Sequence, residues 1–382
     1  MLAEVAAVRS IRPADLARFR KLAAPEAVAA AVRLSMARRK AAEKFARGDR
    51  MWVEAVGVEQ STAEPVARHK AARFGAGPLV VDLCAGIGGD AIAMAARSQV
   101  LAVDLDPGMC RRMLWNASVY DVGNRVLAVQ AQAETFAIPR GAWVHLDPDR
   151  RAIGDRQAHA LEDYAPGPSS WESIVRSVSA GAIKVSPGAD FARHFPDPGF
   201  EIELISLRGE CKEATVWFGA LASCRRRATR LPEGVTWTDR DGGAPTPAGV
   251  SPLSSWIYDP DPSLIRAGLL DGFAQAHGLR RVADGVDYLT AADRVETPFL
   301  AAFSVRDVST LDLKHLRRMI ERHHVGTLEI KVRGVDLTPE ILRARLKPRG
   351  EESATLLIVG GAGPTRAVLA QRLFQGSRSE IR

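Results

Sequence analysis

The stretch Val81-Asp82-Leu83-Cys84-Ala85-Gly86-Ile87-Gly88-Gly89-Asp90 decides how the middle of this chain folds. The apolar run from Leu79 to Leu83 predicts a buried strand, the glycines predict a sharp turn, and residues 90–97 predict a helix. A second apolar run, Val100 to Asp104, predicts the next strand and ends in a carboxylate. Strand, glycine-rich turn, helix and strand together indicate a βαβ unit, in which the turn brings the backbone close to a ligand.

The same alternation of short apolar runs and helical stretches continues through residue 224, which predicts an α/β fold around a parallel sheet. Its last two strands, Glu201 to Leu207 and Thr215 to Leu221, are joined by a short polar turn and predict an antiparallel hairpin. The other expected strands are Val126–Gln130, Trp143–Asp147 and Ala182–Val185.

Composition divides the chain into four parts. Residues 1–75 predict a basic helical region, and residues 76–224 form the domain with the glycine-rich turn. Residues 225–258 are rich in proline and glycine and predict a linker. Residues 259–382 predict a second, smaller α/β domain, with helices that include Leu264–Gly278 and Thr365–Phe374.

The net charge of +7 comes entirely from residues 1–75, which hold 15 Lys and Arg against 8 Asp and Glu, whereas the rest holds 37 of each sign. Basic helices at one end of a chain suit a polyanion such as RNA, because phosphates are bound by charge neutralisation. The alternative is a solvated helix face whose lysines and arginines serve solubility. The charge pattern by itself leaves both interpretations open.

Cysteine usage and hydropathy bear on the compartment. The four cysteines lie far apart, and no spacing of Cys and His suggests a zinc site. We find neither a secretory signal nor an uninterrupted apolar run of roughly 18 residues, the length that a membrane span requires. We therefore expect a cytoplasmic protein with no bound metal and no membrane span.

Two carboxylates frame the glycine-rich turn and indicate which ligand it takes. Asp104 follows Asp82 by 22 residues, a distance at which an acid at the second strand's tip accepts the hydroxyls of a ribose. Nicotinamide dinucleotides use the same spacing. Asp82, however, stands four residues before Gly86, where it would repel a pyrophosphate and attract the ammonium and sulfonium of S-adenosylmethionine. The pattern favours S-adenosylmethionine.

These motifs resemble a known family. The glycine-rich stretch together with Val103-Asp104-Leu105-Asp106-Pro107 is similar to the trimethylguanosine-synthase-like branch of class I methyltransferases, in bacterial proteins that add a C-terminal THUMP-like domain. The resemblance implies a Rossmann-like, seven-stranded sheet that ends in an antiparallel hairpin. It covers nearly the whole chain and extends to Arg39–Phe45, Glu59–Thr62, Leu146–Arg151, Lys184–Gly188, Tyr258–Pro262 and Glu329–Gly334.

The resemblance also implies a cofactor site. The turn residues surround the methionine part of the cofactor, Asp104 holds its ribose, and Leu105 packs beside the adenine. Gln132 stands where relatives place an acid for the adenine amino group, and its amide carbonyl can accept the same hydrogen bond. Either Gln132 does so or it is an ordinary loop residue. The turn residues around the methionine part are Asp82, Ala85, Gly86 and Gly88, and Cys84 and Gly89 are the other turn residues expected to bind the cofactor.

The end of the fourth strand is the expected reaction site. Relatives that methylate amines carry an Asp, Asn or Ser, two prolines and an aromatic residue there, whereas this chain has Asp147-Pro148-Asp149-Arg150-Arg151. Asp147 and Pro148 match and are the expected catalytic residues, but the stacking aromatic is missing, so methylation of guanine N2 is not carried over. Arg150 and Arg151 either contact phosphate or form an internal ion pair. Lys184, at the end of the fifth strand, either touches the substrate or extends to solvent.

The leading hypothesis is an RNA methyltransferase, with tRNA as the first candidate because THUMP domains of tRNA-modifying enzymes bind tRNA. A second hypothesis is an RNA-binding protein that retains the cofactor fold without turnover, which the altered fourth-strand segment suggests. A third is a methyltransferase that acts on a small molecule or a protein. We expect His145, inside the fourth strand, to be a packed core residue in each case.

Overall fold

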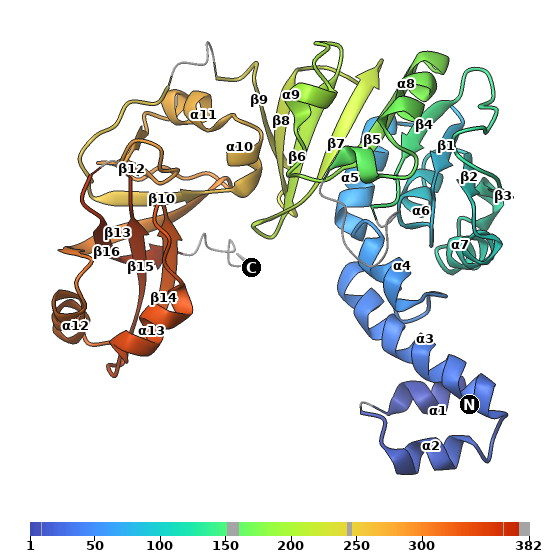
Figure 1. The fold of residues 1–382 in the computed structure, drawn as a ribbon, viewed down its shortest axis with the longest axis horizontal. Helices are drawn as coiled ribbons and strands as arrows, with labels where there is room; N and C mark the ends of the chain where they lie inside the picture. Colours follow the sequence, from blue (N-terminus) through green and yellow to red (C-terminus); the bar gives the residue numbers. More distant parts are fainter. Residues whose placement is uncertain (9, 151–159, 243–246, 362, 374–382) are drawn as a thin grey trace, which may run out of the picture. The chain divides into compact units, whose positions relative to one another are not determined.

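The structure, a computed structural model, describes residues 1–8, 10–150, 160–242, 247–361 and 363–373. The chain forms two compact units (Figure 1). The first consists of Met1–Ile202 with Glu213–Ser223, and the second consists of Glu203–Lys212 with Cys224–Arg382. Within the described residues, no helix combines the length and the apolar character that crossing a membrane requires.

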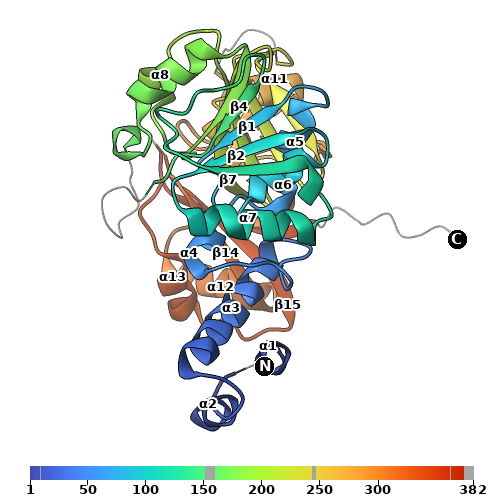
Figure 2. The same cartoon turned by 90° about the vertical axis from the view of Figure 1, so that its right-hand side faces the viewer.

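The first unit begins with helices, as the sequence predicts for residues 1–75. They are α1 (Leu2–Ala7), α2 (Pro13–Phe19), α3 (Pro25–Lys44), α4 (Ala55–Gln60) and α5 (Glu64–Phe74). Figures 1 and 2 show α1 and α2 at the end of α3 that points away from the sheet. Val5, Phe19 and Val28 form a small apolar core there, whereas Ala41 and Phe45, at the other end of α3, belong to the main core under the sheet.

The sheet of the first unit has the strand order β3-β2-β1-β4-β5-β7. All neighbouring strands are parallel except β7, which runs antiparallel to β5. The register pairs Leu83 of β1 with Val103 of β2 and with Leu146 of β4, so the carboxyl ends of these strands meet at one edge. The elements are β1 (Val80–Leu83), α6 (Gly89–Ala95), β2 (Val100–Asp104), α7 (Pro107–Val119), β3 (Val126–Gln130), β4 (Trp143–Leu146), α8 (Pro168–Ser177), β5 (Ala180–Val185), α9 (Phe191–His194) and β7 (Glu210–Gly219).

Burial explains why the central strands read as continuous apolar runs. Every residue of β1 and β5 is buried, because helices cover both faces of a parallel sheet. Each fully buried Val or Leu contributes about 1.5–3 kcal/mol relative to exposure. The few polar residues on these strands are therefore costly unless they have partners, and three of them, Asp82, His145 and Lys184, lie near the carboxyl-terminal edge.

The second unit holds strands β6 (Glu201–Leu207), β8 (Arg226–Leu231) and β9 (Val235–Thr238) in the order β6-β8-β9. Segment 225–258, expected as a linker, thus contains two strands and the start of β10. A seven-stranded sheet follows, in the order β11-β12-β10-β13-β16-β15-β14. Its elements are β10 (Trp256–Pro260), α10 (Pro262–Arg266), α11 (Leu270–Ala276), β11 (Arg280–Arg281), β12 (Leu289–Ala291), β13 (Leu300–Thr310), α12 (Leu313–Arg322), β14 (Val325–Arg333), α13 (Pro339–Leu346), β15 (Glu352–Val359) and β16 (Arg366–Leu373).

One predicted helix of this unit is wrong, and another is interrupted. Within the predicted helix Thr365–Phe374, residues Arg366–Leu373 form strand β16, which pairs with β13 and β15, and Phe374 lies outside the described residues. Its Ala367, Val368, Leu369 and Ala370 are all buried, and a strand buried on both faces gives the same unbroken apolar run as a buried helix. Leu264–Gly278 divides into α10 and α11, because Gly268 adopts a left-handed φ of 69° between them.

Candidate functional site

A cavity of about 830 Å³ lies at the carboxyl ends of β1, β2 and β4 in the first unit. It gathers most of the residues that the sequence singled out. Gly88 and Lys184 are not in its wall, and Arg151 lies outside the described residues. The predicted residues that line it are Asp82, Cys84, Ala85, Gly86, Gly89, Asp104, Leu105, Gln132, Asp147, Pro148 and Arg150.

The glycine-rich turn needs its glycines for two different reasons. Gly88 has φ 91°, and a Cβ there would lie 2.9 Å from Cγ of Met113, so both conformation and space exclude a side chain. Gly86 has φ 54°, but a Cβ there would meet nothing within 4 Å, because this side of the turn faces the cavity. Asn116 of α7 donates from Nδ2 to the carbonyl of Ile87 (3.0 Å) and holds the turn in place.

Asp104 ties the turn to the end of β2. Its carboxylate accepts hydrogen bonds from the backbone N–H groups of Gly86 (2.8 Å) and Asp106 (2.9 Å). Burial raises the pKa of Asp104 above its ordinary value, against the opposing effect of these N–H groups. Leu105 beside it exposes 65% of its surface, so an apolar side chain is available at the cavity for a flat ring. Gln132 lines the same wall, together with Glu134, an acid that the sequence argument did not consider.

Asp82 is buried and only half satisfied. Its Oδ1 lies 2.7 Å from Nδ1 of His145, while its Oδ2 is buried without a hydrogen-bond partner among the described residues. Burial raises the pKa of Asp82, and the neighbouring His145 opposes the shift. His145 is fully buried as expected, but it is a polar contact of the site and not an apolar packing residue. An orphaned carboxylate oxygen beside a cavity indicates a cationic or hydrogen-bond-donating ligand.

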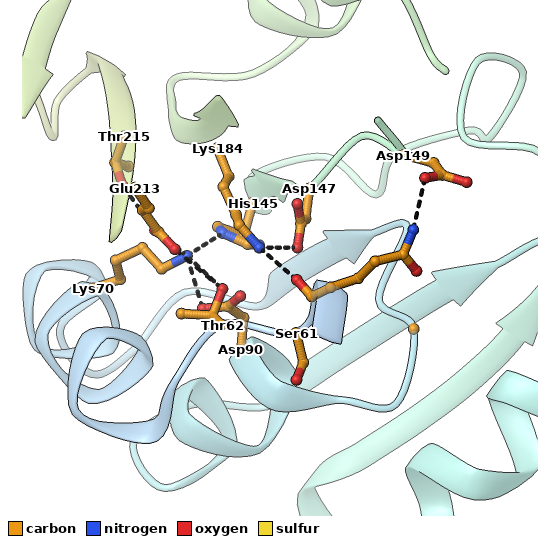
Figure 3. Close-up of polar contacts among 12 residues, drawn as sticks. Ser61, Thr62, Lys70, Asp90, His145, Asp147, Asp149, Lys184, Glu213 and Thr215 are labelled. Atoms are coloured by element: carbon orange, nitrogen blue, oxygen red, sulfur yellow. Dashed lines mark hydrogen bonds and ion pairs between the residues drawn. The ribbon is translucent and has the colours of Figure 1, made fainter. Parts of the chain in front are cut away.

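A buried charge cluster lies behind this carboxylate (Figure 3). Lys70 of α5 is 2.9 Å from Asp90 of α6, 2.8 Å from Glu213 of β7 and 3.3 Å from Nε2 of His145. Burial would lower the pKa of Lys70, but Asp90 and Glu213 raise it well above its ordinary value. Lys70 holds the pKa of Asp90 below its usual range in spite of burial. The cluster fastens α5, α6, β4 and β7 together behind the turn.

Lys184 does not extend to solvent, which was one of the two alternatives expected for it. It is buried, and its Nζ donates to Oδ2 of Asp147 (2.7 Å) and to the backbone carbonyl of Gln60 (3.2 Å). Asp147 remains in the cavity wall, with 23% of its side chain exposed. Asp149 accepts a hydrogen bond from Nε2 of Gln60 (2.9 Å), which also lines the cavity. The structure therefore makes Lys184 a support for Asp147 and not a group at the surface.

Helix α4 supplies one wall that the sequence argument missed. Gly57, Glu59 and Gln60 of α4, with Ser61 and Thr62 after it, line the cavity. The stretch Glu59–Thr62 stood out only as part of the family resemblance, because six helical residues without an apolar stripe give no local signal for a site. Packing alone brings them to the cavity: a Cβ on Gly57 would lie 2.8 Å from Cγ2 of Ile87.

The charge of the cavity wall fits a cation. Eight carboxylate side chains and one guanidinium line it. Lys70 neutralises part of the buried charge behind the wall, His145 contacts one oxygen of Asp82, and Lys184 pairs with Asp147, but the other oxygen of Asp82 has no partner among the described residues. An acidic wall of this kind suits an ammonium and a sulfonium better than a pyrophosphate. Among the described residues no three His, Cys, Asp or Glu side chains are grouped so that they could hold a metal ion.

Several of the N-terminal basic residues make internal contacts. Arg38 donates to the carbonyls of Met51 (2.7 Å) and Arg50 (3.0 Å), and Lys44 donates to the carbonyl of Val58 (2.6 Å) at the end of α4. Part of the basic excess of residues 1–75 therefore stabilises the first unit, and only the remainder is available to a partner.

Comparison with known proteins agrees with this site. Residues 77–181 match a family model described as RNA cap guanine-N2 methyltransferase, and residues 300–372 match one described as THUMP domain-like. Two Mycobacterium tuberculosis proteins, from strains CDC 1551 and H37Rv, are each described as an uncharacterized S-adenosylmethionine-dependent methyltransferase. Each is 35% identical over 319 residues, which cover 82% of this chain and 86% of the relative.

The fold has a counterpart among solved structures. A crystal structure of a "putative methyltransferase" from Porphyromonas gingivalis W83 superposes with a TM-score of 0.75 at 19% identity, covering 98% of this chain and 94% of that one. At this identity the likeness concerns the fold. With the two curated relatives, the glycine-rich turn and the acidic cavity, it leads to one conclusion: the chain belongs to the S-adenosylmethionine-dependent methyltransferases, with an RNA cap guanine-N2 methyltransferase-like core and a C-terminal THUMP-like domain.

Proposed function

We propose that this enzyme transfers the methyl group of S-adenosylmethionine to RNA, with tRNA as the first candidate. The observation that carries the proposal is the combination, in one chain, of a core similar to RNA cap guanine-N2 methyltransferases and a THUMP-like domain. Within the core, the glycine-rich turn and Asp147 line the same cavity, so a donor and an acceptor can meet there.

The geometry of the turn supports the proposed cofactor residues. The orphaned Oδ2 of Asp82 suits the ammonium of the cofactor, the open side of Gly86 admits its methionine part, and Asp104 accepts from its ribose. Leu105 and Gln132 serve the adenine. The cofactor brings a methyl group already activated on a sulfonium, so the protein has mainly to hold the acceptor atom in line with it.

Asp147 orients the acceptor in this proposal. Its carboxylate accepts an N–H or O–H of the target base, while Lys184 fixes the carboxylate from behind as a positioning residue. Arg150 lines the same cavity and offers a planar guanidinium that can contact a phosphate or stack on a base. It occupies the part of the segment in which relatives carry a stacking aromatic residue.

One observation favours the runner-up, an RNA-binding protein without turnover. One oxygen of the Asp147 carboxylate, Oδ2, already accepts a hydrogen bond from Lys184 (2.7 Å), so it is engaged within the protein and not directed only at an acceptor. A methyltransferase that acts on a small molecule or a protein stays the third candidate. All three share the cofactor site and differ in what receives the methyl group.

Single-turnover transfer of labelled methyl to total RNA separates the three. We expect label in RNA from the natural protein, and a rate about 10²–10⁴-fold lower for Asp147→Asn, the range of a positioned acid or base. Glu172→Gln changes an exposed carboxylate outside the cavity wall and is the matched control. Tight RNA binding without label would favour the scaffold, and label in protein or small molecules alone would favour the third candidate.

A further inference from the structure

Two tryptophans lie side by side on the surface of the first unit. Trp52 precedes α4 and exposes 39% of its surface, and Trp115 on α7 exposes 49%. Their ring centroids are 5.2 Å apart, with an interplanar angle of 56°. Rings of this size usually bury most of their area, so a pair left open on one surface marks a binding site.

The pair is held in position before any partner binds. Asn116, next to Trp115, accepts the backbone N–H of Trp52 (2.6 Å) and donates to its carbonyl (3.2 Å). The guanidinium of Arg38 lies 5.4 Å from the ring centroid of Trp52 and is itself fixed by the carbonyls of Arg50 and Met51. A rigid aromatic surface loses little conformational entropy on binding.

The tryptophans are connected to the cavity along α7. Met109 lines the cavity, and Met109, Arg112 and Trp115 follow at intervals of three residues, so each lies next to the following one along the helix surface. Six residues of helix span about 9 Å. Arg112 also forms an ion pair with Glu54 (3.3 Å), directly before α4, whose residues line the cavity. A polymeric substrate with one unit in the cavity can therefore reach the tryptophans with the units that follow it.

The chemistry of this surface suits single-stranded nucleic acid. Arg111 is exposed and stands one helical turn before Trp115 on α7, and Arg50 is exposed and stands two residues before Trp52, so two guanidinium groups are available close in sequence to the two rings. Aromatic rings that stack with unpaired bases, next to cations that meet the phosphates, are how proteins bind single-stranded RNA. Duplex RNA hides the faces of its bases and does not offer this contact.

We propose that Trp52 and Trp115 form a stacking surface for an unpaired base that neighbours the methylated nucleotide of the RNA substrate. The inference rests on the proposed function in one respect, because it assumes that the acceptor in the cavity is RNA. It adds that this RNA is unpaired next to the target, and it names the contact that holds it.

Binding of a labelled oligouridylate, followed by fluorescence anisotropy, tests the surface. We expect Trp52→Ala and Trp115→Ala each to weaken binding roughly tenfold, since each base stacked on an aromatic ring contributes to that extent. The corresponding changes to Phe should retain most of the affinity. The dependence of affinity on salt should keep its slope, because no phosphate contact is lost. Leu127→Ala, which changes an apolar residue on β3 that is more exposed than either tryptophan (71%), is the control and should change nothing.

An abasic oligomer of the same length gives the decisive comparison. Neither tryptophan change should affect binding of the abasic oligomer. An equal loss of affinity for the abasic oligomer and the oligouridylate would overturn the proposal. Unchanged oligouridylate binding by a variant with both Trp52→Ala and Trp115→Ala would also overturn it. If the natural protein methylates RNA while the tryptophan variants bind normally, the stacking surface is refuted and the proposed function stands. If no RNA is methylated but tryptophan-dependent binding is found, the surface stands and the proposed function fails.

Discussion

The two units of this chain build sheets from similar residues but use carboxylates in opposite ways. In the first unit, Asp82 and Asp104 end neighbouring strands and face a cavity, and one oxygen of Asp82 has no partner among the described residues. In the second unit, both carboxylate oxygens of Asp259 on β10 have partners on β14. Lys331 donates to Oδ2 (2.9 Å), and Arg333 donates two hydrogen bonds to Oδ1 (3.0 and 2.7 Å).

This difference separates carboxylates that stabilise the fold from carboxylates that bind a ligand. A carboxylate whose oxygens are matched by cations of its own sheet stabilises the fold, and nothing about it requires a ligand. A carboxylate left half satisfied beside a cavity costs free energy in the absence of a ligand, and that cost is offset when a donor or cation binds. The first unit contains both kinds, because Lys70 and its partners lie directly behind Asp82.

The largest expected effect is on the buried cluster of the first unit. Lys70→Met leaves Asp90 and Glu213 buried without their cation, so we expect the free energy of unfolding to fall by about 3–5 kcal/mol. Chemical denaturation followed by tryptophan fluorescence measures it. Arg176→Met removes the cation of an exposed pair with Glu172 and should cost no more than about 1 kcal/mol. Equal losses in the two variants would show that the cluster does not hold the unit together.

A smaller effect is expected in the second unit. Asp259→Asn weakens the contacts to Lys331 and Arg333, and we expect a loss of about 1.5–3 kcal/mol of stability, the usual cost for a hydrogen bond to a charged group. Adenosylmethionine affinity, measured by calorimetry, should stay unchanged, since these residues lie outside the cavity wall. If Asp259→Asn changed the affinity for adenosylmethionine and left the stability unchanged, Asp259 would belong to a ligand site and the distinction between the two kinds of carboxylate would be wrong.

The smallest effect concerns pH. Burial raises the pKa of Asp104, so acid protonates it at a higher pH than an exposed aspartate, and only the ionised form can accept from both ribose hydroxyls. Adenosylmethionine affinity should therefore be constant near neutral pH and fall as the pH drops through the raised pKa of Asp104. Asp104→Asn should weaken binding about tenfold at neutral pH and remove this acid step. Titration calorimetry of both proteins measures it, and an identical acid step in Asp104→Asn would assign the titration to another group.

Much of the candidate site was predictable because its signals are local. Gly86, Gly88 and Asp104 lie within one βαβ unit, where glycine positions and strand ends follow from sequence spacing. The contacts of Lys184 are not predictable in the same way. Its partners Asp147 and Gln60 lie outside its own strand and far from it in the sequence, so residue spacing cannot predict the buried ion pair.

The limits of sequence periodicity explain the errors of the second unit. The run from Arg366 to Leu373 is apolar on both sides of a central strand, and such a run has neither the alternation of a half-buried strand nor the period of an amphipathic helix. The Tyr258–Pro262 and Glu329–Gly334 segments stood out as motifs, but their contact through Asp259 and Arg333 joins residues 74 positions apart. Only the folded sheet gives these motifs a physical role.

The amino-acid sequence by itself determined the turn, the strands around it and the acids at their tips, because these depend on backbone freedom, apolar periodicity and short spacing. Only the tertiary structure decided which acids are neutralised. Lys70 of α5 contacts Asp90, Glu213 and His145, which come from three other elements, while one oxygen of Asp82 has no partner among the described residues. The physical reason is that desolvation and ion pairing depend on distance in space, and residues far apart along the chain set that distance.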